Sequence, residues 1–200
     1  MKATVYGVGI NDADYAVYKW EYVIVDGKKK QKIVWTCPYY RVWHSMMERS
    51  YSKSYQEKNP TYIGCSVSEE WKRFSNFKRW MEKQDWEGKQ LDKDLLVNGN
   101  KVYSRETCVF VSRVVNLFMT DRGALRGEYR IGVYWNKRVG KFMSRCRNPF
   151  TKKQEYLGLF VNELEAHQAW LKRKLELAYQ LAAEQTDERV GKALIARYDS

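Results

Sequence analysis

The stretch Gln90–Asn116, QLDKDLLVNGNKVYSRETCVFVSRVVN, decides how the rest of the chain is interpreted. Two close carboxylates, Asp92 and Asp94, are followed by an Asn-Gly turn signal between two segments of strand-like sequence. Ser112 then predicts the start of a helix that carries Asn116 on its first full turn. Oxygen ligands on a hairpin and on the next helix suit one hard divalent cation. The same residues also suit an ordinary surface hairpin with acidic side chains in solvent.

Length and composition limit the fold and the partners. The 200 residues allow one large domain or two small ones, and 44% hydrophobic residues suffice for hydrophobic cores. The sequence has no apolar run of membrane-spanning length and no hydrophobic signal region, so we expect a cytoplasmic protein without a membrane partner. The net charge of +12 favours a polyanionic partner, most often nucleic acid. The four cysteines form no C-x-x-C pair and are expected to be reduced, small, buried or half-buried residues.

The segments before Gln90 alternate between strand and helix signals. Residues 1–36 are predicted to be strands, and YVIVDGKKKQKIVWT predicts a hairpin that turns at Asp26-Gly27. From Pro38 the apolar spacing predicts a helix. A second helix is expected to begin at Ser66 or Ser68, with its aromatic residues in the core.

The segments after residue 128 predict a separate small domain. RIGVYWN, GKFMSRCR and KQEYLGLF are predicted to form a three-stranded antiparallel sheet, and an amphipathic helix capped by Asn162 covers it. The leucines at 164, 171 and 175 and Ala178 are expected to form the buried stripe of that helix. The predicted fold class is α+β, with a first domain at 1–120, a linker at 121–128, a second domain at 129–185 and a C-terminal tail of helix turns at 186–200 whose LIARYDS end is expected to be loose.

The excess positive charge is concentrated on the predicted sheet. Nine basic residues lie between Arg126 and Lys153, against the single acid Glu128. Strand alternation assigns basic and polar side chains to one face and apolar side chains to the other, where the helix packs. On the third strand Leu157 and Leu159 are assigned to the apolar face, opposite Gly158. A basic sheet face of this kind fits the major groove of double-stranded DNA.

The tail resembles the AP2 DNA-binding domain. The pattern G-V-Y-W, G-K-F-x-x-x-C-R, Y-L-G-L-F and E-A-H-x-A-W covers residues 130–170. The resemblance and the basic cluster together give the candidate DNA-binding residues Arg130, Tyr134, Lys137, Arg138, Lys141, Arg145, Arg147, Gln154 and Tyr156. Only Arg147 keeps the residue of the family at its position, so the resemblance does not carry over a target sequence.

Residues 39–116 resemble phage HNH homing endonucleases that carry an AP2 domain. The pattern runs Y-R-V-W-H-S-M-M-E-R-S-Y, C-S-V-S-E-E-W-x-x-F-x-N-F and L-D-K-D, and it ends at Asn116. The resemblance implies a ββα-metal site in which Asp92 and Asn116 hold one Mg²⁺ or Mn²⁺. It also implies that Lys93 stands where the family has its general-base histidine.

The lysine changes the expected chemistry. A general base near neutral pH suits an imidazole, whereas an ammonium group has no free electron pair to accept a proton. Three alternatives stay open: Lys93 contacts the phosphate, Asp94 or a metal-bound water acts as the base, or the nuclease is inactive.

Two functions follow from the sequence. The first is a site-specific, metal-dependent endonuclease of the HNH homing type, a hydrolase that acts on DNA in the host cytoplasm. The second is a DNA-binding or regulatory protein that keeps an inactive nuclease scaffold. A monomer is expected in either case.

Overall fold

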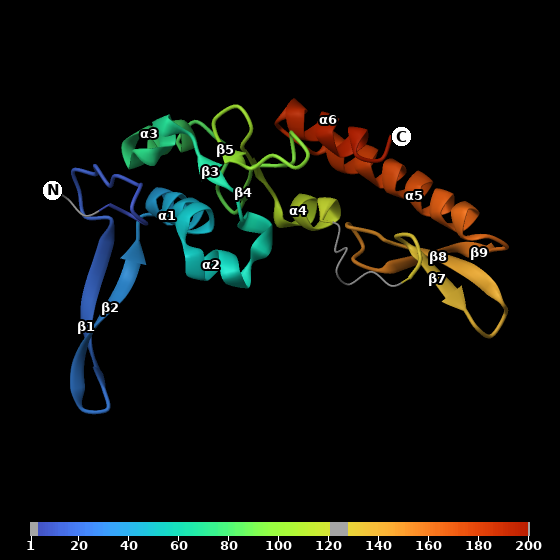
Figure 1. Cartoon of the computed structure of the whole chain (residues 1–200), viewed down its shortest axis with the longest axis horizontal. Helices are drawn as coiled ribbons and strands as arrows, with labels where there is room; N and C mark the ends of the chain where they lie inside the picture. The colour runs from blue at the N-terminus through green and yellow to red at the C-terminus, as the bar shows by residue number, and fades with distance from the viewer. Residues whose placement is uncertain (1–3, 121–127, 200) are drawn as a thin grey trace. The chain divides into compact units, whose positions relative to one another are not determined.

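The computed structural model describes residues 4–120 and 128–199, which combine helices with several small sheets in an α+β fold (Figure 1). Contacts divide the chain into two compact units, Met1–Phe110 and Val111–Ser200. The helix α4 (Arg113–Met119) therefore belongs to the second unit. Of the linker expected at 121–128, only Glu128 lies among the described residues.

The first unit begins with a hairpin and continues as short helices and strands. Its elements are β1 (Tyr18–Val25), β2 (Lys28–Thr36), α1 (Pro38–Tyr51), α2 (Lys53–Lys58), the 3-10 turn η1 (Pro60–Tyr62), β3 (Ser66–Val67), the 3-10 turn η2 (Glu69–Lys72), α3 (Phe74–Met81), β4 (Gln90–Asp92), β5 (Val102–Tyr103) and β6 (Val109–Val111), which runs into the second unit.

The predicted β1–β2 hairpin is confirmed. Asp26 and Gly27 both have positive φ, 52° and 71°, which is the backbone of the tight turn that matches the twist of a hairpin. The hairpin projects as an arm from its unit (Figure 1), and side chains such as Tyr22 (63% exposed) and Ile24 (79% exposed) lie in solvent.

Aromatic residues form the core of the first unit, as predicted. Trp71, Phe74 and Phe77 are each at most 1% exposed, and the indole of Trp43 donates to the Trp71 carbonyl at 2.7 Å. The helix expected from Ser66 or Ser68 is interrupted, because the backbone of Ile10 hydrogen-bonds with Lys72 and Phe74. That contact separates η2 from α3.

The strands of the stretch Gln90–Asn116 pair differently from the prediction. No β-ladder joins residues 90–96 to 101–103 in the described chain: β4 pairs with β6, and β5 pairs in parallel with β3. The amide groups of Ser66 and Ser68 donate to the carbonyls of Lys101 and Tyr103 and hold β5 there. The predicted hairpin is therefore wrong, because a more distant segment takes the backbone partners.

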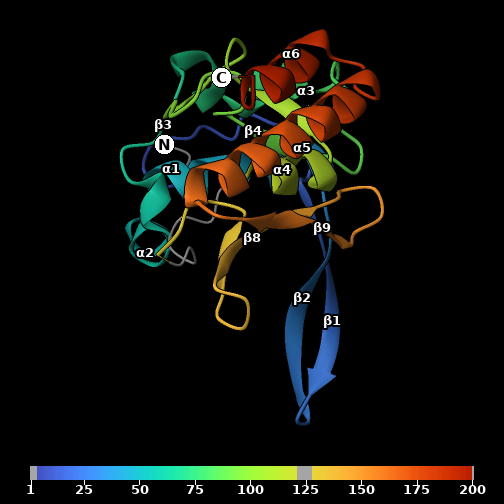
Figure 2. The same cartoon turned by 90° about the vertical axis from the view of Figure 1, so that its right-hand side faces the viewer.

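The second unit contains the predicted antiparallel sheet β7-β8-β9 with a helix across one face (Figure 2). The predicted caps are present, because the side chains of Ser112 and Asn162 accept from the amides of Val115 and Glu165. The elements after α4 are β7 (Val133–Asn136), β8 (Lys141–Arg147), β9 (Gln154–Phe160), α5 (Glu163–Ala183) and α6 (Glu188–Ala196).

A β-bulge corrects the predicted faces of β9. The register shifts between Ser144 and Arg145, so Tyr156 lies opposite Arg145 while Gly158 lies opposite the buried Ser144. Leu159 then lies opposite Met143, on the outer face, and is 38% exposed. Simple alternation assigned Gly158 to the outer face and Leu159 to the inner face, because the extra residue of a β-bulge leaves no pattern in the sequence.

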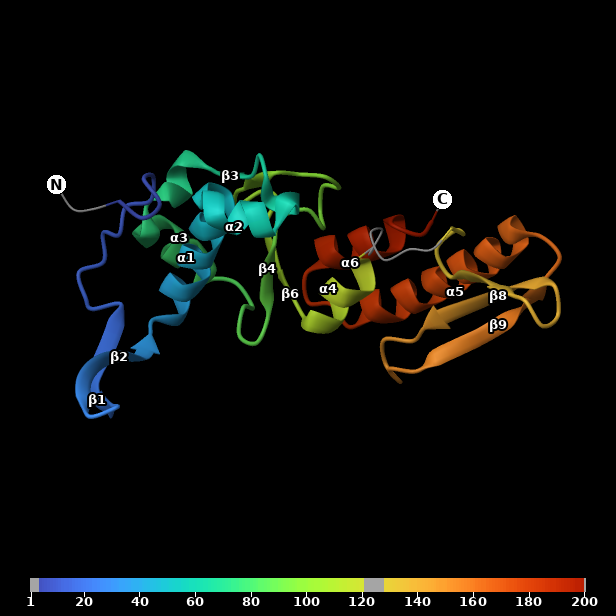
Figure 3. The ribbon, with the colours of Figure 1, turned by 60° about the horizontal axis from the view of Figure 1, so that its bottom comes forward.

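Two expectations about the helices are also corrected. The buried stripe of α5 consists of Ala166, Trp170, Leu177, Ala178 and Leu181, so of the four predicted stripe residues only Ala178 belongs to it. The LIARYDS end, expected to be loose, contains the last residues of α6 and the buried Tyr198, and the N-terminus of α6 is capped by the Asp187 side chain. The α6 side chains Val190 and Leu194 are buried, and α6 packs on α5 (Figure 3).

Candidate functional site

The outer face of the second unit's sheet gathers most of the predicted DNA-binding residues. Cross-strand pairs place Arg145 beside Tyr156 and Arg147 beside Gln154, and all four side chains are exposed. Tyr134, 49% exposed, extends the same face on β7, opposite Met143. Side chains that stand on one side of paired strands reach a common ligand together.

The positive charges of this face and its turn are not neutralised by any residue that the structure describes. The set comprises Lys137, Arg138, Lys141, Arg145 and Arg147, and across residues 4–120 and 128–199 none of them forms an ion pair. Lys137 and Arg138 lie in the β7–β8 turn, and Lys141 begins β8. Their charges are therefore available to an external anion.

The one acidic residue of the three strands points away from this face. Glu155 pairs with the buried Cys146 across the sheet, and its carboxylate accepts from Arg173 of α5 at 2.7 and 3.1 Å and from Asn148 at 2.7 Å. Arg173 lowers the pKa of Glu155, which stays ionised under the sheet. The outer face is thus left with cations, aromatic rings and an amide.

Arg130 lies apart from this set. Its amide donates to the Glu163 carboxylate at 2.6 Å, and its guanidinium lies 3.9 Å from the same carboxylate. Arg130 therefore connects the entry to the sheet with the start of α5, a contact that the sequence pattern did not indicate.

Asp92, at the end of β4, is held by the backbone that follows it. One oxygen of its carboxylate accepts from the amides of Asp94 and Leu95, at 3.0 and 2.7 Å. Burial and the charge of Asp94 raise the pKa of Asp92 despite these two hydrogen bonds.

Lys93, in the position of the expected general base, is buried and engaged inside its own loop. Its ammonium group donates to Asp94 at 3.1 Å and to the Asn100 carbonyl at 3.0 Å, and its side chain is 8% exposed. The Asn100 side chain in turn donates to the carbonyls of Lys93 and Val102. These bonds make Lys93 a structural tie between the ends of the loop.

The acidic loop by itself offers only part of the ligand set of a divalent cation. A hard cation needs several oxygen ligands, but one Asp92 oxygen binds two amides and Asp94 binds the Lys93 ammonium. No group of three or more His, Cys, Asp or Glu side chains suited to a metal occurs in the described ranges. Asn116, the second expected ligand, is a half-buried residue of α4 in the other unit.

The histidines and cysteines have structural surroundings. Nδ1 of His167 lies 2.9 Å from the Ile131 carbonyl and its ring stacks on Trp170, while His44 packs beside Tyr6 and Tyr40. The cysteines at 37, 65, 108 and 146 are buried and free, as predicted.

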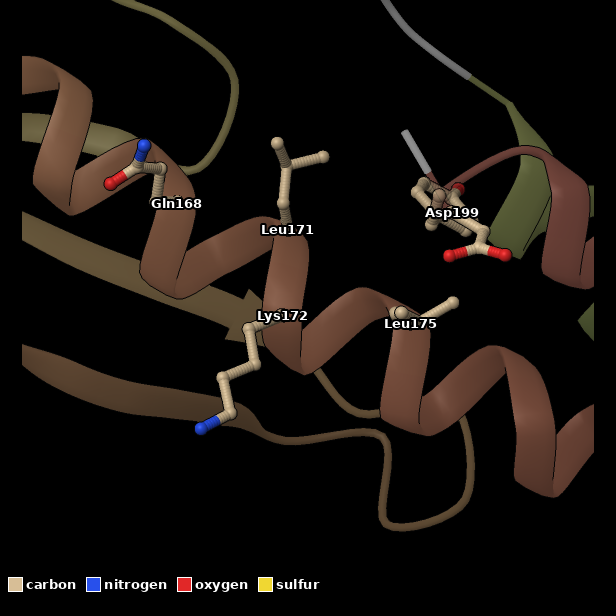
Figure 4. A pocket seen from close by; sticks show the side chains of 6 residues that line it. Gln168, Leu171, Lys172, Leu175 and Asp199 are labelled. Atoms are coloured by element: carbon tan, nitrogen blue, oxygen red, sulfur yellow. The ribbon is translucent and has the colours of Figure 1, made fainter.

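A groove beside α5 offers no comparable charge. Its walls include Gln168, Leu171, Lys172, Leu175 and Asp199 (Figure 4), a mixture of apolar side chains with one cation and one carboxylate. A ligand of one charge sign gains little there.

Comparisons with protein-family models, curated proteins and solved structures found no significant match for this chain. Among the described residues, no helix has the length and apolar character needed to cross a membrane.

Proposed function

We propose that this protein binds double-stranded DNA through the outer face of β7-β8-β9. The observation that carries the proposal is a set of cations, three on this sheet face and two in its β7–β8 turn, that form no ion pair with any described residue. The only carboxylate of the three strands is bound by Arg173 on the opposite side. Phosphate contacts from Lys and Arg supply affinity, and a sheet of this width enters a major groove.

The side chains on this face suit different parts of the DNA. Arg145 and Arg147 suit guanine edges or phosphates, and Gln154 suits an adenine edge. Tyr134 and Tyr156 add apolar surface beside them. The turn residues Lys137 and Arg138 lie where a flanking backbone would pass, and they provide charge without base selection.

The first experiment is a competition assay. A labelled DNA duplex is bound by the full chain and displaced by unlabelled duplex, single-stranded DNA or RNA duplex. The proposal expects DNA duplex to compete at the lowest concentration, because A-form RNA closes its major groove to a sheet. Stronger competition by single strands or RNA would contradict it.

Metal-dependent DNA cleavage, the activity of HNH homing endonucleases, is the second candidate function. The observation that favours it is the pair Asp92 and Asp94, in which burial and the neighbouring charge raise the pKa of Asp92. A cation near two such carboxylates would relieve their repulsion. The loop alone supplies too few ligands, so this candidate requires further oxygen atoms from DNA or water.

The test for cleavage incubates the protein with DNA from the genomic region that encodes it, in the presence of Mg²⁺ or Mn²⁺. Cleavage that disappears in Asp92→Ala supports the second candidate, provided that the variant still binds the duplex. Tight binding without nicks under either metal leaves DNA binding as the function and eliminates the nuclease.

A further inference from the structure

A pocket of about 340 Å³ lies within the second unit, between α4, the end of β8, the β8–β9 turn and α5. Four cations line it: Arg113, Arg147, Lys152 and Lys174. Part of its wall is apolar and comes from Val114, Leu117 and Phe118 of α4 together with Pro149. Among the residues that the structure describes, no carboxylate belongs to the lining.

Three of the four cations are free to bind a ligand. Arg113, Arg147 and Lys152 are exposed, and none of them forms an ion pair within the ranges that the structure describes. They come from a helix, a strand and a turn, so they approach the pocket from different sides. Convergent donors on separate elements are typical of a binding site rather than of a solvated surface.

The fourth cation, Lys174, is held at the inner wall. Its ammonium group donates to the Phe118 carbonyl at 2.9 Å and lies 3.5 Å from the centre of the Phe118 ring and 5.0 Å from that of Tyr198. Figure 3 shows α4 beside α5 and α6. The contacts of the ammonium group with Phe118 and Tyr198 place it between α4 and the chain after α6. A cation with little solvent around it favours an anion that enters the pocket.

We propose that this pocket binds the phosphate group of a nucleotide. The four cations match a phosphate, whose oxygens accept several charge-assisted hydrogen bonds. The apolar wall formed by Val114, Leu117 and Pro149 matches the sugar and base that accompany it. Arg147 belongs both to this pocket and to the outer sheet face, so the phosphate comes either from a DNA backbone on that face or from a free nucleotide.

A phosphate supplied by a DNA backbone rests on the proposed DNA binding, whereas a phosphate supplied by a free nucleotide does not. Two binding measurements therefore separate the two sources. Calorimetry measures the binding of a nucleoside monophosphate and, for comparison, of inorganic phosphate. Fluorescence anisotropy measures the binding of a DNA duplex at several salt concentrations. Both use the full chain.

Lys152→Gln and Lys153→Gln form the matched pair of variants. The two residues are neighbours in the same turn and both are exposed, but only Lys152 lines the pocket. A double variant Arg113→Gln, Lys152→Gln removes two of the four cations. Circular dichroism verifies that each variant keeps the fold.

The expected result is about 10-fold weaker phosphate binding for each pocket cation removed, and no change in Lys153→Gln. If the backbone is the source, the salt slope of duplex binding falls by about 0.9 for each lost contact. If a free nucleotide is the source, the monophosphate affinity falls while duplex binding by the double variant matches that of Lys153→Gln. The proposal is overturned if the double variant and Lys153→Gln bind both the monophosphate and the duplex with equal affinity. A wild-type chain that binds the monophosphate but not the duplex refutes the DNA function and leaves the pocket proposal standing.

Discussion

The buried ammonium of Lys174 makes the stability of the second unit depend on pH in a defined direction. Burial lowers the pKa of Lys174 from 10.5 to about 8. The charged form is therefore disfavoured in the folded state, and the destabilisation is complete below about pH 8. It is lost as the pH rises from about 8 towards 10.5, so the contribution of Lys174 to the stability of the unit increases in that interval.

The size of the effect follows from linkage. Between about pH 7 and pH 9 a lysine with these two pKa values changes the free energy of unfolding by about 1 kcal/mol. Cys146 on β8 and Arg197 after α6 act on its charge, and the Tyr198 ring lies beside it. Three other cations line the same pocket as Lys174: Arg113, Arg147 and Lys152. Burial raises the pKa of Cys146 from 9.0 to about 11, which opposes the lysine effect as the pH rises through the ordinary thiol pKa. Cys146 is present in both wild type and a Lys174 variant, so its effect cancels when the two are compared.

The assay compares wild type with Lys174→Met by urea unfolding at pH 7 and pH 9. Hydrogen exchange of peptides from β8 and α5 reports the second unit alone. The Phe118 carbonyl keeps a donor in the variant, because the Tyr198 hydroxyl also donates to it at 3.0 Å. We expect the stability difference between the two proteins to move by about 1 kcal/mol in favour of wild type from pH 7 to pH 9. An equal difference at both pH values would refute the reasoning and show that the surrounding rings fully offset burial.

Two further substitutions test the packing of each unit. In the second unit, a Cβ at Gly132 (φ +80°) would overlap the indole of Trp170, so Gly132→Ala should cost about 2–5 kcal/mol from strain and overpacking. Thermal unfolding measures this against Gly140→Ala, which has a similar positive φ but open space around it and should lose only about 1–2 kcal/mol; equal losses would disprove the clash. In the first unit, Lys93→Met removes the donor shared by Asp94 and the Asn100 carbonyl and should cost roughly 1–3 kcal/mol. Faster hydrogen exchange at 93–102 is expected for Lys93→Met and not for the exposed Lys83→Met, and unchanged exchange would show that Lys93 does not tie the loop.

Features set by neighbouring residues were predictable from the sequence. Asp26-Gly27 predicts its hairpin turn, and Ser112 and Asn162 predict their helix caps, because each signal and its effect lie within four residues. The alternation of β8 likewise places Arg145 and Arg147 on one exposed face.

Features that depend on distant partners were not predictable. The pairing of β5 with β3 and the bulge in β9 are decided by tertiary contacts that leave no local pattern. Lys174 has the sequence context of a solvated helical lysine, yet α4 and the chain after α6 enclose it. The helix α6 did have a signal, since Asp187 precedes Val190 and Leu194 at helical spacing.

The central claim is that the sheet face of the second unit binds DNA, and the salt dependence of duplex binding tests it most directly. The measurement compares Lys141→Gln, Arg145→Gln on the sheet with Lys172→Gln, Lys192→Gln on α5 and α6, since all four side chains are exposed and each double variant removes two charges. The account predicts that only the sheet variant loses affinity, by at least about 10-fold, and that its salt slope falls by about 2. Equal losses in both variants, or a wild-type chain that does not bind duplex DNA, would contradict it.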